Sequence, residues 1–392
     1  MDVSVLRPCL LALALAATVT AGGEARTTPA RITPALEELV GQKLVVTMDG
    51  KTPSASLLAR ARLGRIGGVI IHSWNFTSAA SLRSVTSRLQ QAAAAGGRPP
   101  LLIGADQEGG PVKTISWIPP SLSPRQLGAL HSGTKADRQG QATGRALRSL
   151  GVNLDFAPLV DVPGSPSSFL YRQGRTWSFA SHTTARMSGW FAIGLGQSGV
   201  IASAKHFPGL GLAELDTDRS FVRITATRDE LAPGLKPFKT AIADRVPLIM
   251  LSNALYTAYD GGSSAGWSRA VGTKLLRNRL GFRGATITDS LDGAAHARHV
   301  GTGGLAARAA QAGTDLLLLT GSERGSQSVY RSLLHAAAPG RIDQARLLAS
   351  YERILTLKTI LRKRASIGRW PATSSSGQPV QTISSRSRRW RR

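Results

Sequence analysis

Cysteine is nearly absent from this chain of 392 residues, because Cys9 is its only one. A disulfide framework is therefore excluded. No GxGxxG follows the first strand-like run, and no HExxH occurs. These absences argue against a dinucleotide-binding fold and against a zinc-protease site, so we expect the protein to need no cofactor and no metal ion.

Acidic residues are scarce, with 23 Asp and Glu against 49 Lys and Arg, which gives a formal net charge of +26. No acidic residue follows Glu352, and residues 365–392 are rich in Ser, Gly, Pro and Arg, which is typical of a disordered tail. We expect this basic tail to attract anionic polymers of a cell envelope; a solvated tail without a partner is the alternative. The body has no helix-turn-helix or basic-aromatic pattern, so nucleic acid is not an expected partner.

Long hydrophobic runs are also missing. The longest, Cys9–Val19, follows Arg7 and precedes a Val19-Thr20-Ala21 cleavage site. It is too short for a comfortable membrane span and fits a signal peptide over residues 1–25, with an uncleaved anchor as the alternative. We therefore expect a secreted, extracellular protein, associated with the cell wall through its tail, without a transmembrane span in the mature chain.

Short apolar runs alternate with helix-length segments along the rest of the chain. Eight repeats of this kind indicate a (β/α)8 TIM barrel, an α/β fold; a doubly wound open sheet is the alternative, since periodicity does not distinguish closure. The predicted helices include 79–95, 136–150, 183–196, 227–243, 274–280, 304–312 and a last one over 341–364. The predicted strands are 44–48, 68–72, 101–105, 153–158, 200–205, 247–252, 285–288 and 315–319.

Polar side chains recur where the predicted strands end. The carboxyl ends of barrel strands meet on one face, where active sites form. A single carboxylate there is also typical of a helix cap, but five coinciding strand ends are hard to explain by capping. The residues at these ends are Asp106, Gln107, Glu108, Asp155, Asp161, Lys205, His206, Asn253 and Asp289.

The segment KHFPGLGLAELDTDRS (205–220) concentrates ionisable side chains after the fifth predicted strand. Lys205 and His206 end the strand, and Glu214, Asp216 and Asp218 follow on a glycine-containing loop. Cations fixed beside loop carboxylates suit acid–base chemistry on a polyhydroxylated substrate. Internal ion pairs with solvated acids are the structural alternative.

Five motifs, in this order, resemble those of glycoside hydrolase family 3, and within it the single-domain bacterial β-N-acetylhexosaminidases. The resemblance covers residues 36–362 and implies one TIM-barrel domain that takes a carbohydrate substrate. The family's nucleophile matches Asp289, and its ligands for sugar hydroxyls match Asp106, Arg175, Lys205 and His206. The motifs are GADQEGGPV (104–112), GVNLDFAPLVDV (151–162), RTWSF (175–179), KHFPG (205–209) and GFRGATITDSL (281–291).

One departure concerns the group that protonates the leaving oxygen. In the hexosaminidases it is a histidine of an Asp-Ser-His element, whereas here that position holds Asp218, in Asp216-Thr217-Asp218. We therefore expect Asp218 to be the catalytic acid and base, with Asp216 as an anion that raises its pKa. Pro111 and Thr114 also stand where the family has arginines, which weakens the transfer of acetamido-sugar specificity.

These observations predict an exported retaining glycosidase that cleaves β-linked amino sugars or related glycans, such as peptidoglycan fragments. The alternative is a catalytically impaired glycan-binding or regulatory protein at the cell wall. The intact Asp289 favours hydrolysis, because a purely binding protein needs no nucleophile. The missing histidine favours the glycan-binding alternative.

Overall fold

The computed structural model describes residues 34–366. The predicted signal peptide (1–25) lies outside this range, and so does the predicted tail from residue 367 onward. The last helix, which we predicted to end at Arg364, continues to Ser366. Within the described residues no helix is long and apolar enough to cross a membrane.

Eight parallel strands form a nearly closed, TIM-like barrel, in the order β11-β9-β7-β6-β3-β2-β1-β12. β1 pairs with both β2 and β12, and a parallel bridge between Ile287 and Leu316 links the two ends of the sheet. All eight predicted strands are confirmed, with differences of a few residues at their ends. The strands are β1 (Leu44–Thr47), β2 (Gly68–Ile70), β3 (Leu102–Ala105), β6 (Leu154–Asp155), β7 (Ile201–Phe207), β9 (Leu248–Leu251), β11 (Ala285–Thr288) and β12 (Leu317–Leu319).

Helices surround the barrel, and local sequence signals explain where they begin. Ser78 and Thr227 each cap a helix through a reciprocal side-chain and backbone pair, as expected from the Ser and Thr preference at this position. The helices outside the loops at the carboxyl ends of the strands are α1 (Leu36–Gly41), α2 (Ala55–Arg62), α3 (Ala79–Ala95), α5 (Gly133–Ser149), α7 (Ser181–Gln197), α8 (Arg228–Ala243), the π-helix η3 (Ala270–Arg279), α10 (Thr302–Ala312), α11 (Glu323–Ala337) and α12 (Gln344–Ser366).

Alternating side chains of the strands build two apolar layers. Val45 and Ile70 point into the barrel with Leu102, Ile201 and other residues of the inner cluster. Their strand neighbours face outward and pack under the helices in a larger cluster. This alternation is the two-residue period of a strand, so both faces of the barrel are buried.

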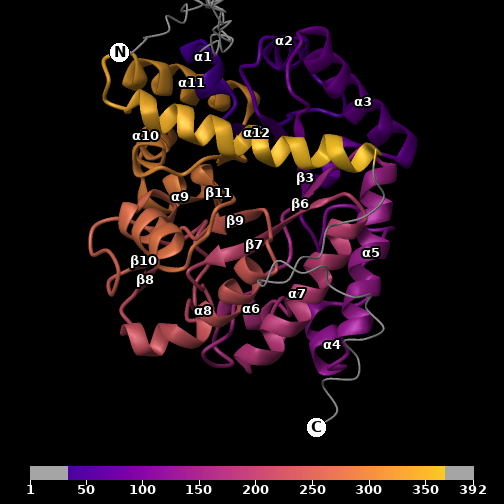
Figure 1. The fold of residues 1–392 in the computed structure, drawn as a ribbon, viewed down its shortest axis with the longest axis vertical. Coiled ribbons are helices and arrows are strands. Elements are labelled where there is room, and N and C mark those ends of the chain that lie inside the picture. Colours follow the sequence, from indigo (N-terminus) through magenta and orange to yellow (C-terminus); the bar gives the residue numbers. More distant parts are fainter. Residues whose placement is uncertain (1–33, 367–392) are drawn as a thin grey trace, which may run out of the picture. The chain divides into compact units, whose positions relative to one another are not determined.

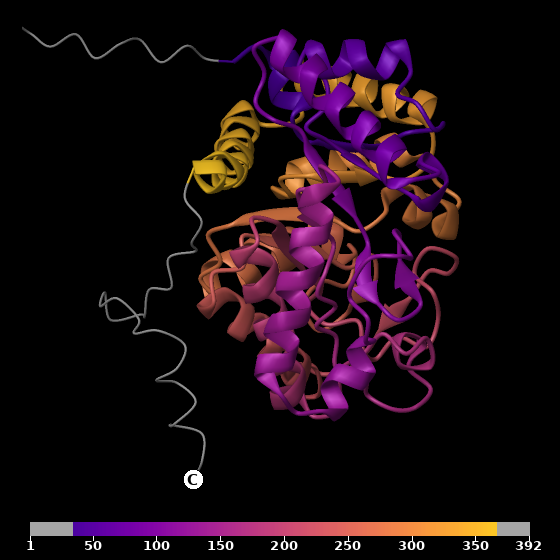
Figure 2. The ribbon, with the colours of Figure 1, turned by 90° about the vertical axis from the view of Figure 1, so that its right-hand side faces the viewer.

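Helix α12 closes the amino-terminal end of the barrel, as the two ribbon views show (Figures 1 and 2). Ile354 and Leu357 are buried in the same cluster as the inner strand residues. The Lys358 Nζ atom donates a 2.7 Å hydrogen bond to Oε1 of Gln42, just before β1. With this end filled by side chains, the opposite end is left for the substrate.

Short helices and strands lie in the loops that follow the carboxyl ends of the barrel strands. A hairpin of β4 (Gln107–Gly109) and β5 (Val112–Lys113) follows β3 directly. A second pair, β8 (Arg223–Ile224) and β10 (Leu255–Tyr256), joins the loops after β7 and β9. The other short elements are η1 (Ser73–Asn75), α4 (Pro124–Ala129), α6 (Phe169–Arg172), η2 (Ala265–Trp267) and α9 (Leu291–Arg298).

Candidate active site

A cluster of four charged side chains lies where β3 and β7 end. Lys205 Nζ lies 2.6 Å from Oδ1 of Asp106 and 2.7 Å from Oε1 of Glu108. Arg175 donates to both carboxylate oxygens of Glu108, at 3.0 Å from Nε and 2.7 Å from Nη2. Glu108 is fully buried, whereas the Asp106 side chain is one-third exposed. Asp106 is therefore the carboxylate of this cluster that a ligand reaches.

The opposite charges in this cluster keep each of its side chains ionised. Burial by itself raises the pKa of Glu108, but the charges and hydrogen bonds of Arg175 and Lys205 lower it to about 2. Burial lowers the pKa of Lys205, but Asp106 and Glu108 outweigh burial and raise it above the ordinary lysine value. The cluster thus presents fixed charges, which bind hydroxyl groups more strongly than neutral partners do.

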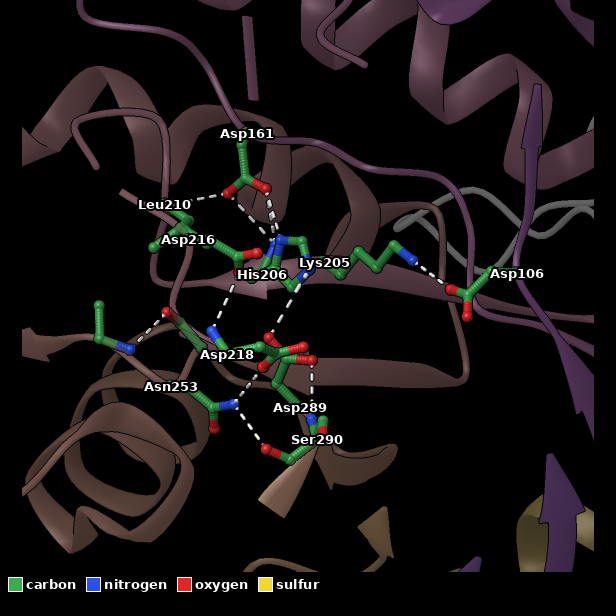
Figure 3. A network of polar contacts seen from close by, with 12 residues as sticks. Asp106, Asp161, Lys205, His206, Leu210, Asp216, Asp218, Asn253, Asp289 and Ser290 are labelled. Carbon is green, nitrogen blue, oxygen red and sulfur yellow. Dashed lines mark hydrogen bonds and ion pairs between the residues drawn. The ribbon is translucent and has the colours of Figure 1, made fainter. Parts of the chain in front are cut away.

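Asp161 holds His206 and the start of the following loop. Its buried carboxylate lies 2.8 Å from Nδ1 of His206 and accepts hydrogen bonds from the backbone N–H groups of His206 and Leu210. The other ring nitrogen of His206, Nε2, lies 3.9 Å from Oδ2 of Asp289. Asp161 thereby orients the imidazole toward Asp289 (Figure 3).

Asp289 follows the last residue of β11. Its backbone N–H donates to the carbonyl of Leu251 at 3.0 Å, which extends the pairing of β11 with β9 by one residue. Its Oδ1 accepts a 2.8 Å hydrogen bond from the N–H of Ser290, the N-cap of α9. The short Asp289 side chain is therefore held between a strand end and a helix start, and it remains partly exposed.

Asp218 reaches the same place from the loop after β7. Its N–H donates to Oδ1 of Asp216 at 3.0 Å, and its own Oδ1 lies 3.4 Å from Nδ2 of Asn253. The same Asn253 nitrogen donates to the carbonyl of Ser290 at 2.8 Å, so this amide links the loop to the residue after Asp289 (Figure 3). A Cβ atom at Gly293 would lie 2.4 Å from Asp218 Oδ1, so the carboxyl rests directly on α9.

Three effects raise the pKa of Asp218 to about 8: burial first, then the negative charges of Asp289 and Asp216. A carboxyl with this pKa holds its proton at neutral pH and loses it as the pH rises through about 8. Asp218 is therefore suited to donate a proton beside the negative charge of Asp289. A carboxyl group whose surroundings keep it protonated at neutral pH is typical of a general acid in an enzyme.

Every residue that the sequence analysis placed in the site lies at this end of the barrel. Asp106, Lys205 and Arg175 form one group, and His206, Asp289, Asp218 and Asp216 form another. Glu214, the third carboxylate of the loop after β7, belongs to neither group. It accepts a 2.6 Å hydrogen bond from Ser167 at the surface.

Sequence reasoning noted Glu108, Asp161 and Asn253 at strand ends but gave them no role. Their signal was their position at the carboxyl ends of predicted strands. Asp155, at another strand end, is buried, which raises its pKa to about 8, and it accepts a hydrogen bond from the Gln107 N–H, so its role is structural. Across residues 34–366, no group of three or more His, Cys, Asp or Glu side chains is arranged to hold a metal ion.

Comparison with known proteins identifies the family of this chain. The model of the glycosyl hydrolase family 3 N-terminal domain matches residues 35–357. The chain belongs to glycosyl hydrolase family 3. This family 3 glycosidase is 32% identical to an uncharacterized secreted glycosyl hydrolase of Arthroderma benhamiae, over 82% of this chain and 92% of the relative.

Bacterial β-hexosaminidases are also similar to this family 3 glycosidase. The enzyme of Alkalilimnicola ehrlichii is 32% identical over 74% of this chain and 82% of its own. Beta-hexosaminidase A of Pseudoalteromonas piscicida is 29% identical over 91% of this chain, which spans 66% of that enzyme's length. A solved family 3 β-N-acetylglucosaminidase from Paenibacillus sp. has a TM-score of 0.81 and 30% identity, covering 90% of this chain and 67% of that one.

Proposed function

We propose that this family 3 glycosidase is exported and removes β-linked amino sugars from cell-wall glycans such as peptidoglycan fragments. The names of its bacterial relatives support the amino sugar, and the secreted relative of Arthroderma supports export. The site supports a carbohydrate substrate, because fixed charges at Asp106, Lys205 and Arg175 replace the water around sugar hydroxyl groups.

The proposed mechanism retains the configuration at the anomeric carbon. Asp289 attacks that carbon and forms a covalent glycosyl-enzyme, while protonated Asp218 gives its proton to the leaving oxygen. The now ionised Asp218 then takes a proton from water, which attacks the same carbon and releases Asp289. His206, fixed by Asp161, positions the sugar and Asp289 for both steps.

The observation that carries this proposal is the position of the Asp218 carboxyl, against Gly293 of α9 and Asn253, where burial and the charge of Asp289 raise its pKa to about 8. A carboxylic acid is useful as a proton donor only if it remains protonated at the working pH. The environment of Asp218 provides this without the histidine of the hexosaminidases. A purely glycan-binding protein has no need for such a carboxyl pair.

Two glycosides test the assignment: a chromogenic one with an activated phenol and one with a sugar leaving group. Asp218→Asn is expected to lower turnover about 100-fold on the sugar leaving group and little on the activated phenol, since only the former needs protonation. Asp289→Asn is expected to abolish turnover of both. Asp292→Asn is the matched control, because the Asp292 carboxylate accepts from Thr302 and Gly321 instead.

Proton NMR of the first product should show the β-anomer, as retention requires. Equal losses on both glycosides in Asp218→Asn would contradict the role of Asp218 as acid. An inactive wild-type protein that still binds the sugars would support glycan binding in place of hydrolysis.

A further inference from the structure

Arg298 is a partly buried cation at the end of α9, the helix that follows Asp289. Burial lowers the pKa of Arg298 to about 10, and no carboxylate in the described part of the chain raises it again. The guanidinium still carries its charge at neutral pH. Because burying a charge without an ionic partner is unfavourable, other neighbours have to stabilise it.

The neighbours of the guanidinium are two aromatic rings and two neutral oxygens. Its Cζ atom lies 3.9 Å from the centroid of the Phe221 ring and 5.1 Å from that of Trp267, which are cation–π contacts. Nη2 donates to the carbonyl of Asn253 at 3.2 Å and to Oγ of Ser264. Trp267 and Ser264 are buried, whereas Phe221 is 44% exposed on the loop after β7. The arginine thus joins an exposed loop residue to buried residues of the barrel.

Phe221 belongs to the same short turn as Asp218, three residues earlier. The N–H groups of Arg219 and Ser220 donate to the carbonyl of Asp216, at 3.2 and 2.9 Å. These bonds fold the segment into a compact turn. A shift of Phe221 therefore also shifts the Asp218 carboxyl.

The contacts of the Asp218 carboxyl alone hold it weakly. Its hydrogen bond with Asn253 is 3.4 Å long, beyond the usual range of about 2.7 to 3.2 Å, and Gly293 limits it only by steric contact. Arg298 supports both neighbours, because it lies on the same helix as Gly293 and holds the Asn253 carbonyl (Figure 3 shows the Asn253 amide between Asp218 and Ser290). The helix that begins after Asp289 therefore contacts the loop of Asp218 in its first turn and at its last residue.

We propose that Arg298 is a positioning residue for the proton donor: it holds Phe221 near Trp267 and thereby keeps the Asp218 carboxyl on α9, beside Asp289. A retaining glycosidase needs its two carboxyl groups about 5 Å apart, and a displacement of about 1 Å can cost about 100-fold in rate. A lysine does not replace this arginine, because an ammonium group has no plane to stack on a ring while it donates to two oxygens. This inference rests on the proposed function, because it takes Asp218 as the acid.

Arg298→Lys is the main test, since it keeps the positive charge at the end of α9 and removes the planar group. We expect kcat/KM to fall about tenfold for the glycoside with a sugar leaving group, the scale of a lost cation–π contact, and less than about twofold for the activated phenol. Phe221→Leu should have the same effect, whereas Phe221→Tyr keeps the ring and should retain the wild-type ratio. The double variant of Arg298→Lys and Phe221→Leu should lose no more than either single variant, because both break one contact.

The alkaline limb of kcat/KM on the sugar leaving group gives a second readout. Burial is the largest effect that raises the pKa of Asp218, the charges of Asp289 and Asp216 add to it, and Arg175 opposes it. A loop that moves away from α9 exposes Asp218 to water, so its pKa falls. The limb expected near pH 8 should therefore move to lower pH in Arg298→Lys, although the number of charges is unchanged.

Arg228→Lys is the matched control. Arg228 also lies over an aromatic ring, 5.8 Å from the centroid of Tyr259, and donates to the carbonyl of Ala258, but at the start of α8. It should change neither the ratio of the two kcat/KM values nor the alkaline limb. Equal losses on both glycosides in Arg298→Lys, or an unmoved limb, would overturn the inference, because a loss of folded protein lowers both activities alike.

Hydrogen exchange of the loop separates this inference from the proposed function, because it needs no turnover. The backbone amides of residues 214–222 should exchange faster in Arg298→Lys and in Phe221→Leu than in the wild type and Arg228→Lys. If the wild type hydrolyses neither glycoside, this faster exchange would still support Arg298 as the residue that holds the loop. A loss in Asp218→Asn on the sugar leaving group alone, with unchanged exchange and activity in Arg298→Lys, would leave the proposed function standing and refute the role of Arg298.

Discussion

Replacing Glu108 with glutamine removes the charge that neutralises Lys205 and Arg175 and keeps the size of the side chain. The two cations lower the pKa of Glu108 from 4.5 to about 2. Each pKa unit corresponds to about 1.4 kcal/mol between the ionised and neutral forms. Glutamine mimics the neutral carboxyl, so we expect the free energy of unfolding at pH 7 to fall by about 3 kcal/mol, as for other broken buried ion pairs.

Thermal and urea unfolding measure this loss. At roughly 2 °C per kcal/mol for a domain of this size, the Tm of Glu108→Gln should fall by about 6 °C. Glu37→Gln is the matched control, because the Glu37 side chain is exposed and its replacement should change stability by less than about 0.5 kcal/mol.

The pH dependence gives the sharper test. Because the pKa of Glu108 is lowered on folding, its contribution is fully present above pH 4.5 and is lost as the pH falls toward about 2. The difference in stability between the wild type and Glu108→Gln should therefore narrow to about 1 kcal/mol at pH 3. A difference below about 1 kcal/mol at pH 7, or one that stays constant down to pH 3, would refute the reasoning.

Three further predictions concern Asp218 and the tail. Gly293→Ala places a Cβ 2.4 Å from Asp218 Oδ1 and should lower kcat about tenfold on sugar leaving groups, with little loss on activated phenols; equal loss on both would contradict this. Asp216→Asn removes a charge that raises the Asp218 pKa, so the alkaline limb of kcat/KM, expected near pH 8, should move to lower pH; an unmoved limb would exclude Asp216 as a cause. Deleting residues 367–392 should abolish salt-sensitive retention on an anionic polymer resin without changing kcat, and unchanged retention would remove the tail's proposed role.

The barrel was predictable because its strands carry a strong local signal. Each strand is a short apolar run, and the polar residue that ends it marks the carboxyl face. The pairs β4–β5 and β8–β10 were missed, since two- or three-residue strands such as Arg223–Ile224 have no periodicity to detect. The last helix was placed within three residues at each end, which is the usual uncertainty of helix termini.

The sequence predicted which polar side chains gather at the carboxyl end of the barrel, but not which of them pair. Strand ends indicated which side chains share the barrel mouth, yet nothing in the sequence assigned Lys205 to both Asp106 and Glu108. Distances between loops also depend on packing. The contact of Asp218 with Gly293 joins residues 75 positions apart, and it depends on how the loop after β7 packs against α9.

The pairing of β1 with β12 determines how late in synthesis and folding the barrel can close. Leu44 lies opposite Leu317, and Lys43 Nζ donates to the carbonyl of Thr314, 271 residues along the chain. Contacts between such distant residues form late in folding, because a long loop must close first. A growing chain that has not yet reached Leu319 leaves β1 and β11 as bare sheet edges. The ribosome therefore has to finish nearly the whole domain before Asp289 faces Asp106 across the nearly closed ring.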